Sequence, residues 1–183
     1  MHSDDWAAYR NLLLTCMFVE TFSNVTHNMY TLEGFTLFRN DGQSSSSNKP
    51  YGGTAVYSKL KFAPGFPYQH NRNGIEITVL RLSVLANVNI IVIYRSQTVP
   101  VHQMCLALQD ILHLQPSSSH QIITGDFNVN WFDITDRCAL FNFLVRDHSY
   151  RQLISEYTTD NSTRIDHVFT NIPEKTIFPH VRE

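Results

Sequence analysis

The apolar residues of this chain fall mainly into short runs rich in β-branched side chains, the pattern of buried strands. The two longest of these span residues 75–84 and 88–94, and residues 13–19 form a further continuous apolar run. Ala86 and Asn87 lie between the long runs, where a turn would join them. The pattern therefore predicts an antiparallel hairpin and a sheet-based core.

Helical spacing of apolar residues appears in a few places only. Residues 100–113 carry them at Val101, Met104, Cys105, Leu108, Ile111 and Leu112, with Pro100 suited to a first turn. Residues 135–147 repeat this spacing, and Ser3, Asp4 and Asp5 could cap a short helix over residues 6–12. Plain core packing is the favoured interpretation of the helix over residues 100–113.

The remaining runs complete a strand-rich order of elements. Shorter strands are expected at residues 32–39, 54–58, 122–124 and 165–169, with Gly125 ending the third, and a last one could begin at 177–181. Residues 40–50 and 61–73 read as loops because they are polar or rich in Pro and Gly. We predict one α/β domain over residues 1–183: two packed, mainly antiparallel sheets flanked by helices, a four-layer sandwich.

Composition agrees with a globular protein. The 183 residues are 43% hydrophobic and 16% charged, and the net charge of -2 argues mildly against a strong non-specific nucleic-acid binder. Cys16, Cys105 and Cys138 are scattered, which suggests reduced, buried thiols inside a cell. No apolar run is long enough to span a membrane.

Candidate chemistry begins at residues 120–133, HQIITGDFNVNWFD. In an extended chain Asp126 and Asn128 would project to the same side, with Phe127 turned into the core. A carboxylate and an amide together can accept a proton or a metal and donate to a phosphate oxygen. From these residues alone, an ordinary Asx-rich turn after a buried strand remains the favoured alternative.

Acids also end or occupy other expected strands. Glu20, Asp126 and Asp166 come from different strands, and buried carboxylates are costly unless they are paired or bind a metal. Oxygen ligands of this kind suit Mg²⁺ or Mn²⁺. Tyr94 and Arg95 end another strand, where they could bind a phosphate or be a packed aromatic and a solvated charge. A solvated strand tip is the commoner role for an acid such as Glu20.

Ordered motifs extend over nearly the whole chain. They are MFVET (17–21), LEGFTLFR (32–39), YGGTAVY (51–57), VIYRS (92–96), GDFN (125–128) and RIDH (164–167). Together they resemble the endonuclease/exonuclease/phosphatase superfamily, in particular the apurinic-site-like endonuclease domains of LINE-type retrotransposons and Helitron-type transposons. This resemblance removes the preference for an ordinary turn at GDFN.

The resemblance implies a role for each matching residue. Glu20 would bind the metal, Tyr94 would contact the scissile phosphate, and Asp126 would orient or deprotonate the attacking water. Asn128 would hold the phosphate or water, and Asp166 would support a catalytic histidine. The implied reaction is Mg²⁺- or Mn²⁺-dependent hydrolysis of a DNA phosphodiester. The implied setting is a nuclear protein, joined in some relatives to a helicase or reverse transcriptase.

The chain departs from the family pattern at both ends, where a first strand bearing an asparagine and a closing Ser-Asp-His motif are expected but not found. His167 should face away from Asp166 and pack, and His180 follows no acid, so neither is assigned the catalytic role. One alternative is therefore a non-catalytic fragment with weak nucleic-acid or protein binding. A phosphoesterase for small molecules or lipids is another, which the mobile-element-like motifs do not favour.

Overall fold

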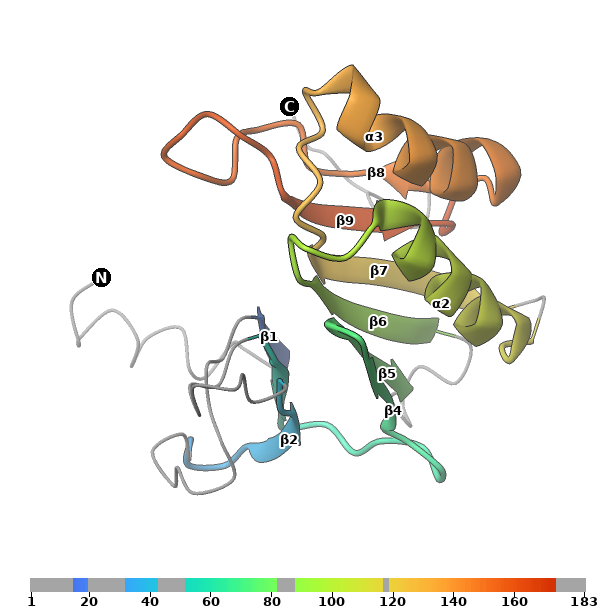
Figure 1. Cartoon of the computed structure of the whole chain (residues 1–183). Coiled ribbons are helices and arrows are strands. Elements are labelled where there is room, and N and C mark those ends of the chain that lie inside the picture. Colours follow the sequence, from blue (N-terminus) through green and yellow to red (C-terminus); the bar gives the residue numbers. More distant parts are fainter. Residues whose placement is uncertain (1–14, 20–31, 43–51, 82–87, 117–118, 174–183) are drawn as a thin grey trace, which may run out of the picture.

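Two packed β-sheets form the body of the protein, seen nearly edge-on in Figure 1. This computed structural model describes residues 32–42, 52–81, 88–116 and 119–173, together with the backbone of residues 15–19. One sheet has the strand order β1-β3-β2 and the other β4-β5-β6-β7-β9-β8. The α/β sandwich expected from the sequence is confirmed for these residues.

The three-stranded sheet is antiparallel throughout. Its strands are β1 (Thr15–Val19), β2 (Thr36–Asn40) and β3 (Thr54–Ser58), with β3 in the centre. Every residue of β3 is buried. Its small and branched side chains suit a central strand that is covered on both faces.

The larger sheet is antiparallel except where β6 and β7 run parallel. Its strands are β4 (Tyr68–Arg72), β5 (Ile75–Arg81), β6 (Val88–Arg95), β7 (His120–Asp126), β8 (Arg151–Gln152) and β9 (Asp166–Thr170). The parallel pair is joined through helix α2 (Val101–His113), as a crossover requires. The predicted hairpin of β5 and β6 and the predicted helix α2 are both confirmed.

Alternation along the strands gives this sheet two different faces. One face packs on α2, on α3 (Ile134–Leu140) and on a π-helix, η1 (Phe141–Asp147), which cover it in Figure 1. Its core includes Ile77, Ile93, Leu108, Ile123 and Phe169. The other face meets the three-stranded sheet through Leu80, Ile90 and Val92, which pack with Val56. Successive residues therefore point either to the helices or to the second sheet.

Two loop and strand assignments from the sequence are wrong. Gly125 does not end its strand, because β7 continues to Asp126. The segment read as a loop over residues 61–73 contains β4, a polar edge strand that pairs with β5. Asn73 and Gly74 both have positive φ (54° and 74°), as a tight hairpin turn requires. The Asn-Gly pair was the signal for this hairpin, and the polar sequence YQHNR concealed it.

The second predicted helix changes type halfway, since α3 gives way to η1 at Phe141. Cys105 is buried as expected, but the expectation is wrong for Cys138, which is exposed on α3. The helix predicted for residues 6–12, the strand at 177–181 and the side chain of Cys16 lie outside the described residues. Among the helices that the structure describes, none has the length and apolar character needed to cross a membrane.

Candidate functional site

A row of polar side chains crosses the larger sheet at one level. Glu76 of β5 lies opposite Tyr94 of β6, Tyr94 lies beside Asp126 of β7, and Asp126 lies opposite Asp166 of β9. Residues in register on neighbouring strands project from the same face. All four therefore point to the side of the sheet that meets the three-stranded sheet. We call these four residues the rim row.

The rim row lies where the strands end or begin. β7 ends at Asp126, β9 begins at Asp166, and β6 ends one residue beyond Tyr94. Tyr94 and Asp126 are buried, with 5% and 4% of their surface exposed, whereas Asp166 is half-buried. The structure thus brings together three predicted site residues, Tyr94, Asp126 and Asp166, at one edge of the sandwich.

The strand that precedes Glu20 reaches the same edge. Val19 pairs with Thr54, and the Thr54 hydroxyl is 2.9 Å from the hydroxyl of Thr78 on β5, close to the rim row. β1 also contacts β6 and β7. Glu20, the predicted metal ligand, lies outside the described residues.

Asn128 holds the carboxylate of Asp126 from two directions. Its backbone N–H donates to Asp126 Oδ1 at 2.8 Å, and its side-chain Nδ2 donates to Oδ2 at 3.2 Å. Nδ2 also donates to the carbonyl of Arg95 at 2.7 Å. Asn128 has a φ of 49°, a left-handed conformation that Asn tolerates better than most residues. The two residues meet through this turn after the strand, not through alternation along it.

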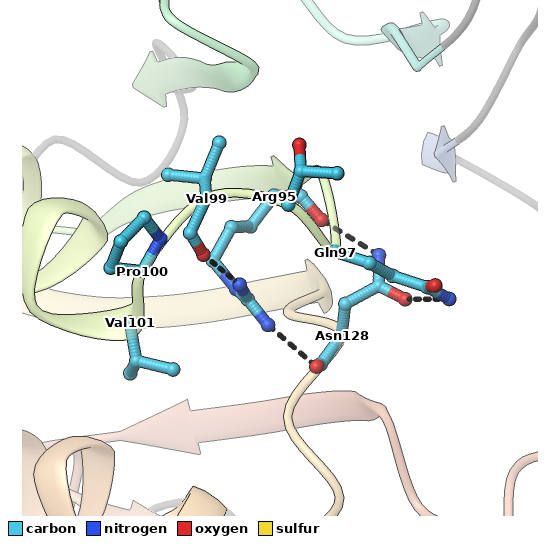
Figure 2. A pocket seen from close by; sticks show the side chains of 7 residues that line it. Arg95, Gln97, Val99, Pro100, Val101 and Asn128 are labelled. Atoms are coloured by element: carbon cyan, nitrogen blue, oxygen red, sulfur yellow. Dashed lines mark hydrogen bonds between the residues drawn. The ribbon is translucent and has the colours of Figure 1, made fainter.

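Arg95 is a buried structural residue, so the two roles considered for it, phosphate binding and solvated charge, are both wrong. Only 4% of it is exposed, and it points to the helical face of the sheet, opposite to Tyr94. Nε donates to the carbonyl of Phe127 and Nη2 to that of Asn128, each at 2.6 Å, and Nη1 donates to the carbonyl of Val99. The guanidinium therefore fixes the backbone of the GDFN turn, which Figure 2 shows for Asn128.

A pocket of about 450 Å³ adjoins this turn, at the start of α2 (Figure 2). It is lined by Arg95, Gln97, Thr98, Val99, Pro100, Val101 and Asn128. Gln97 Nε2 donates to Asn128 Oδ1 at 3.1 Å, so both side chains border the opening. The pocket gives space beside Asn128 for part of a bound molecule.

Substitution of Asn128 separates its backbone role from its amide role. Asn128→Gly keeps the left-handed turn and loses the amide, and we expect it to be destabilised by about 1 kcal/mol. Asn128→Ala loses the amide and also strains the left-handed turn, so we expect it to be destabilised by about 1 kcal/mol more than Asn128→Gly. Urea unfolding of both variants measures the difference. Equal stability of the two would contradict the strain assigned to this turn.

Glu76 is a rim-row residue that the sequence interpretation did not single out. It is 0% exposed, and neither carboxylate oxygen accepts a hydrogen bond of sound geometry. Burial raises the pKa of this carboxyl to about 7, although the nearby backbone N–H of Gly53 lowers it in part. Gly52 lies against Glu76 and Tyr94: a Cβ there would be 2.5 Å from Tyr94 Cε1 and 3.0 Å from Glu76 Oε2. An acid in an otherwise apolar, β-branched run was the available signal.

We expect Glu76→Gln to raise the unfolding free energy of the metal-free protein above that of wild type by more at pH 8 than at pH 4.5. The pKa of the Glu76 carboxyl is about 7 in the folded protein against an ordinary 4.5, so the folded state of wild type loses stability as the pH rises from 4.5 through about 7. The amide does not titrate, so the variant should gain up to about 3 kcal/mol on wild type across this range. Urea unfolding in EDTA measures this gain, and a difference that does not change with pH would refute it.

His167 packs in the core, as expected from its position beside Asp166. It is 0% exposed, Nε2 lies 2.8 Å from the carbonyl of Val129, and Nδ1 lies 2.6 Å from Gln152 Nε2. Burial lowers the pKa of the ring to about 4, outweighing the hydrogen bond to Val129. A neutral ring that donates from Nε2 and accepts at Nδ1 satisfies both contacts. His167 therefore stays uncharged at neutral pH and supports the turn after Asp126.

Oxygen atoms of the rim row fit a hard divalent cation. Asp126 and Asp166 supply carboxylates, and Glu76 adds two buried oxygens that accept no hydrogen bond of sound geometry. Mg²⁺ takes few carboxylates and completes its shell with waters and substrate oxygens. Over residues 32–42, 52–81, 88–116 and 119–173, no His, Cys, Asp and Glu side chains form a group of three able to hold a metal. The rim thus offers the right ligand chemistry for Mg²⁺ or Mn²⁺ without forming a closed cage.

A family profile and several solved structures are similar to this chain, and they point to the same family. A profile described as "Endonuclease/Exonuclease/phosphatase family" matches residues 3–181. No curated protein matches the sequence. One similar solved structure is a protein of that family from Leptotrichia buccalis, with 15% identity, a TM-score of 0.58, and 91% of this chain and 78% of that chain covered.

Two other similar structures carry more specific names. A 3'-5' exonuclease from Neisseria meningitidis has 16% identity and a TM-score of 0.57, over 90% of this chain and 80% of that chain. A mannosyl-6-phosphatase from Bacteroides thetaiotaomicron has 13% identity and a TM-score of 0.53, over 76% of this chain and 63% of that chain. At these identities the likeness shows the fold.

Proposed function

We propose, from the premise that this chain belongs to the endonuclease/exonuclease/phosphatase family, that it is a metal-dependent phosphodiesterase that nicks DNA. Members of this family hydrolyse phosphate esters and generally use a metal. The observation that carries the proposal is the rim row, in which Tyr94, Asp126 and Asp166 lie in register at one edge of the sheet.

Asp126 is proposed to orient and deprotonate the attacking water. Asn128 donates to both of its carboxylate oxygens, which fixes the plane of the group and leaves it the remaining lone pairs. Arg95 holds the backbone on which Asn128 lies. Asn128 therefore acts as a positioning residue for Asp126, beside the role of phosphate or water ligand that the resemblance implies.

Tyr94 and Asp166 are proposed to act on either side of Asp126. Tyr94 would donate its hydroxyl to a phosphate oxygen, and Asp166 would hold a proton-transfer partner in place. Neighbouring strands fix their spacing, so little ordering is needed when a phosphate arrives. A small change in β6 or β9 should therefore disturb the reaction more than one in β8.

Glu20 is proposed as the main metal ligand, and carboxylate oxygens of the rim row are proposed as the remaining protein ligands. A bound Mg²⁺ or Mn²⁺ would neutralise charge on the phosphate and the leaving oxygen. The hard oxygen ligands at the rim support this choice over zinc.

DNA as substrate is supported by the mobile-element-like motifs, especially YRSQTVP (94–100), GDFNVNW (125–131) and TTDNSTRIDH (158–167). The proposal includes an origin in a LINE-type or Helitron-type element, a nuclear location, and a larger polyprotein with a helicase or reverse transcriptase. The solved structures named above include both a nuclease and a sugar phosphatase, so substrate class requires a direct test.

Substrate comparison tests this proposal. Supercoiled DNA, bis(p-nitrophenyl) phosphate and mannose 6-phosphate are offered to the chain with Mg²⁺, and again with EDTA. We expect nicking of DNA and slow cleavage of the chromogenic diester, both lost in EDTA, with no release of phosphate from the sugar. Hydrolysis of mannose 6-phosphate alone would replace the diesterase proposal with a phosphatase.

A further inference from the structure

Two exposed aromatic rings meet on segments that adjoin the rim row: Phe132 follows Asp126 along the chain, and Tyr157 precedes Thr158, whose hydroxyl accepts from the backbone N–H of Asp166 at 3.2 Å. Phe132 and Tyr157 are 46% and 61% exposed, and their ring centroids are 4.9 Å apart. Large apolar side chains with this much exposed surface are normally single, and a contacting pair marks a surface for binding. We call Phe132, Tyr157 and the guanidinium of Arg164 the aromatic platform.

The guanidinium of Arg164 packs against the aromatic rings next to it. Its guanidinium carbon lies 4.6 Å from the centroid of Phe132 and 5.7 Å from that of Trp131. The residue is 6% exposed, and its Nε has no hydrogen bond acceptor. Burial, and then the charge of Arg137, lower the pKa of Arg164.

The two arginines of this cluster donate to backbone carbonyls. Arg137 donates Nη1 to the carbonyl of Trp131, and Arg164 donates Nη1 to that of Ile154. Within the described residues, the ion pairs are Arg39 with Asp41 and Arg146 with Asp147, so neither Arg137 nor Arg164 has a carboxylate partner there. Asp133, Glu156 and Asp160 lie on the same segments, so the two guanidinium groups can make individual phosphate contacts without a local excess of positive charge.

The platform is tied to the catalytic residues by two backbone hydrogen bonds. The N–H of Phe127, next to Asp126, donates to the carbonyl of Ile165, next to Asp166, at 3.0 Å. The N–H of Trp131 then donates to the carbonyl of Arg164, also at 3.0 Å. Two of the segments that carry the platform, residues 127–132 and 164–166, are therefore joined to each other next to Asp126 and Asp166.

We propose that the aromatic platform binds an unstacked base of single-stranded nucleic acid next to the phosphodiester at the rim row. This inference rests on the proposed diesterase function and deepens it by naming the recognised group. Each exposed ring of the tilted pair offers an apolar face on which a base can stack, and the guanidinium of Arg164 beside Phe132 adds a cation–π contribution. A small phosphoester such as a sugar phosphate would have no group to place there.

Binding without catalysis tests the platform. A fluorescein-labelled single-stranded DNA oligonucleotide is titrated with the protein in EDTA, and fluorescence anisotropy gives Kd. Phe132→Ala and Tyr157→Ala are each expected to weaken binding roughly tenfold. Tyr68→Ala, which removes an exposed tyrosine from edge strand β4, is the matched control and should bind as wild type.

An oligonucleotide of abasic residues, with phosphates and sugars but no bases, separates stacking from charge. It should bind wild type about as weakly as the normal strand binds Phe132→Ala, and that substitution should not weaken it further. Equal affinity of wild type for both strands, no binding at all, or no loss in either variant would overturn the platform. If the platform variants and the abasic strand bind weakly as expected but wild type hydrolyses no phosphodiester, the proposed function is wrong and the platform stands.

Discussion

Replacing Asp126 with asparagine is expected to lower the rate of phosphodiester hydrolysis by about 10³-fold, which corresponds to about 4 kcal/mol of transition-state stabilisation. Asparagine has nearly the same shape but no negative charge and cannot take a proton from water. Asp126 is 4% exposed and lies between Tyr94 and Asp166, so water in bulk cannot replace it. kcat and KM for a labelled DNA substrate measure the loss, which should fall on kcat.

Two controls show whether a loss of activity in Asp126→Asn is specific: the stability of the variant, and a matched Asp→Asn substitution elsewhere. The Asp126→Asn variant would keep the hydrogen bond from the backbone N–H of Asn128, so its unfolding free energy in urea should shift by no more than about 1–2 kcal/mol. Asp110→Asn, on the exposed surface of α2, removes the same charge away from the rim and should leave kcat unchanged. Equal kcat for Asp126→Asn and wild type would remove Asp126 from the mechanism.

Gly125→Ala is expected to destabilise the fold by about 3–5 kcal/mol, close to the whole stability of many domains. Gly125 has a φ of 139°, and a Cβ at this position would lie 1.9 Å from the carbonyl oxygen of Ile93 on β6. That atom belongs to the neighbouring strand's backbone and cannot turn away as a flexible side chain could. The close approach of β6 and β7 also sets Tyr94 beside Asp126, so activity should fall with stability.

Gly65→Ala gives the matched control for backbone strain. Gly65 has a φ of 82°, but nothing lies within 4 Å of a Cβ placed there. Its loss should be about 1 kcal/mol, from conformation alone. Urea unfolding of both variants therefore separates strain from collision, and equal losses would show that the contact with Ile93 relaxes.

Several strands, helix α2 and three of the four rim-row residues could be predicted where the sequence carried a strong local signal. The β-branched runs of β5 and β6 and the apolar spacing of α2 are such signals, and the ends of β6, β7 and β9 gave Tyr94, Asp126 and Asp166. β4 was missed because an edge strand needs no apolar alternation, and its polar side chains hid it.

The roles of Arg95 and Glu76 depend on contacts that are distant in sequence. An arginine at a strand end is ordinarily solvated, but here the carbonyls of Val99, Phe127 and Asn128 converge on it. Glu76 lies within an apolar run, and only the packing of β3 and Gly52 against β5 shows that it is sealed from water. Period-2 alternation gives the face of a strand but not what covers that face.

Plasmid nicking by the purified chain tests the central claim most directly, namely that the rim row is a metal-dependent phosphodiesterase site. Supercoiled plasmid is incubated over a range of Mg²⁺ concentrations with wild type, with Asp126→Asn, and with wild type in EDTA. We expect conversion to open circles that rises with Mg²⁺ for wild type and stays at background for the variant and in EDTA. Equal conversion by wild type and Asp126→Asn, or none by wild type at any Mg²⁺ concentration, would contradict the claim.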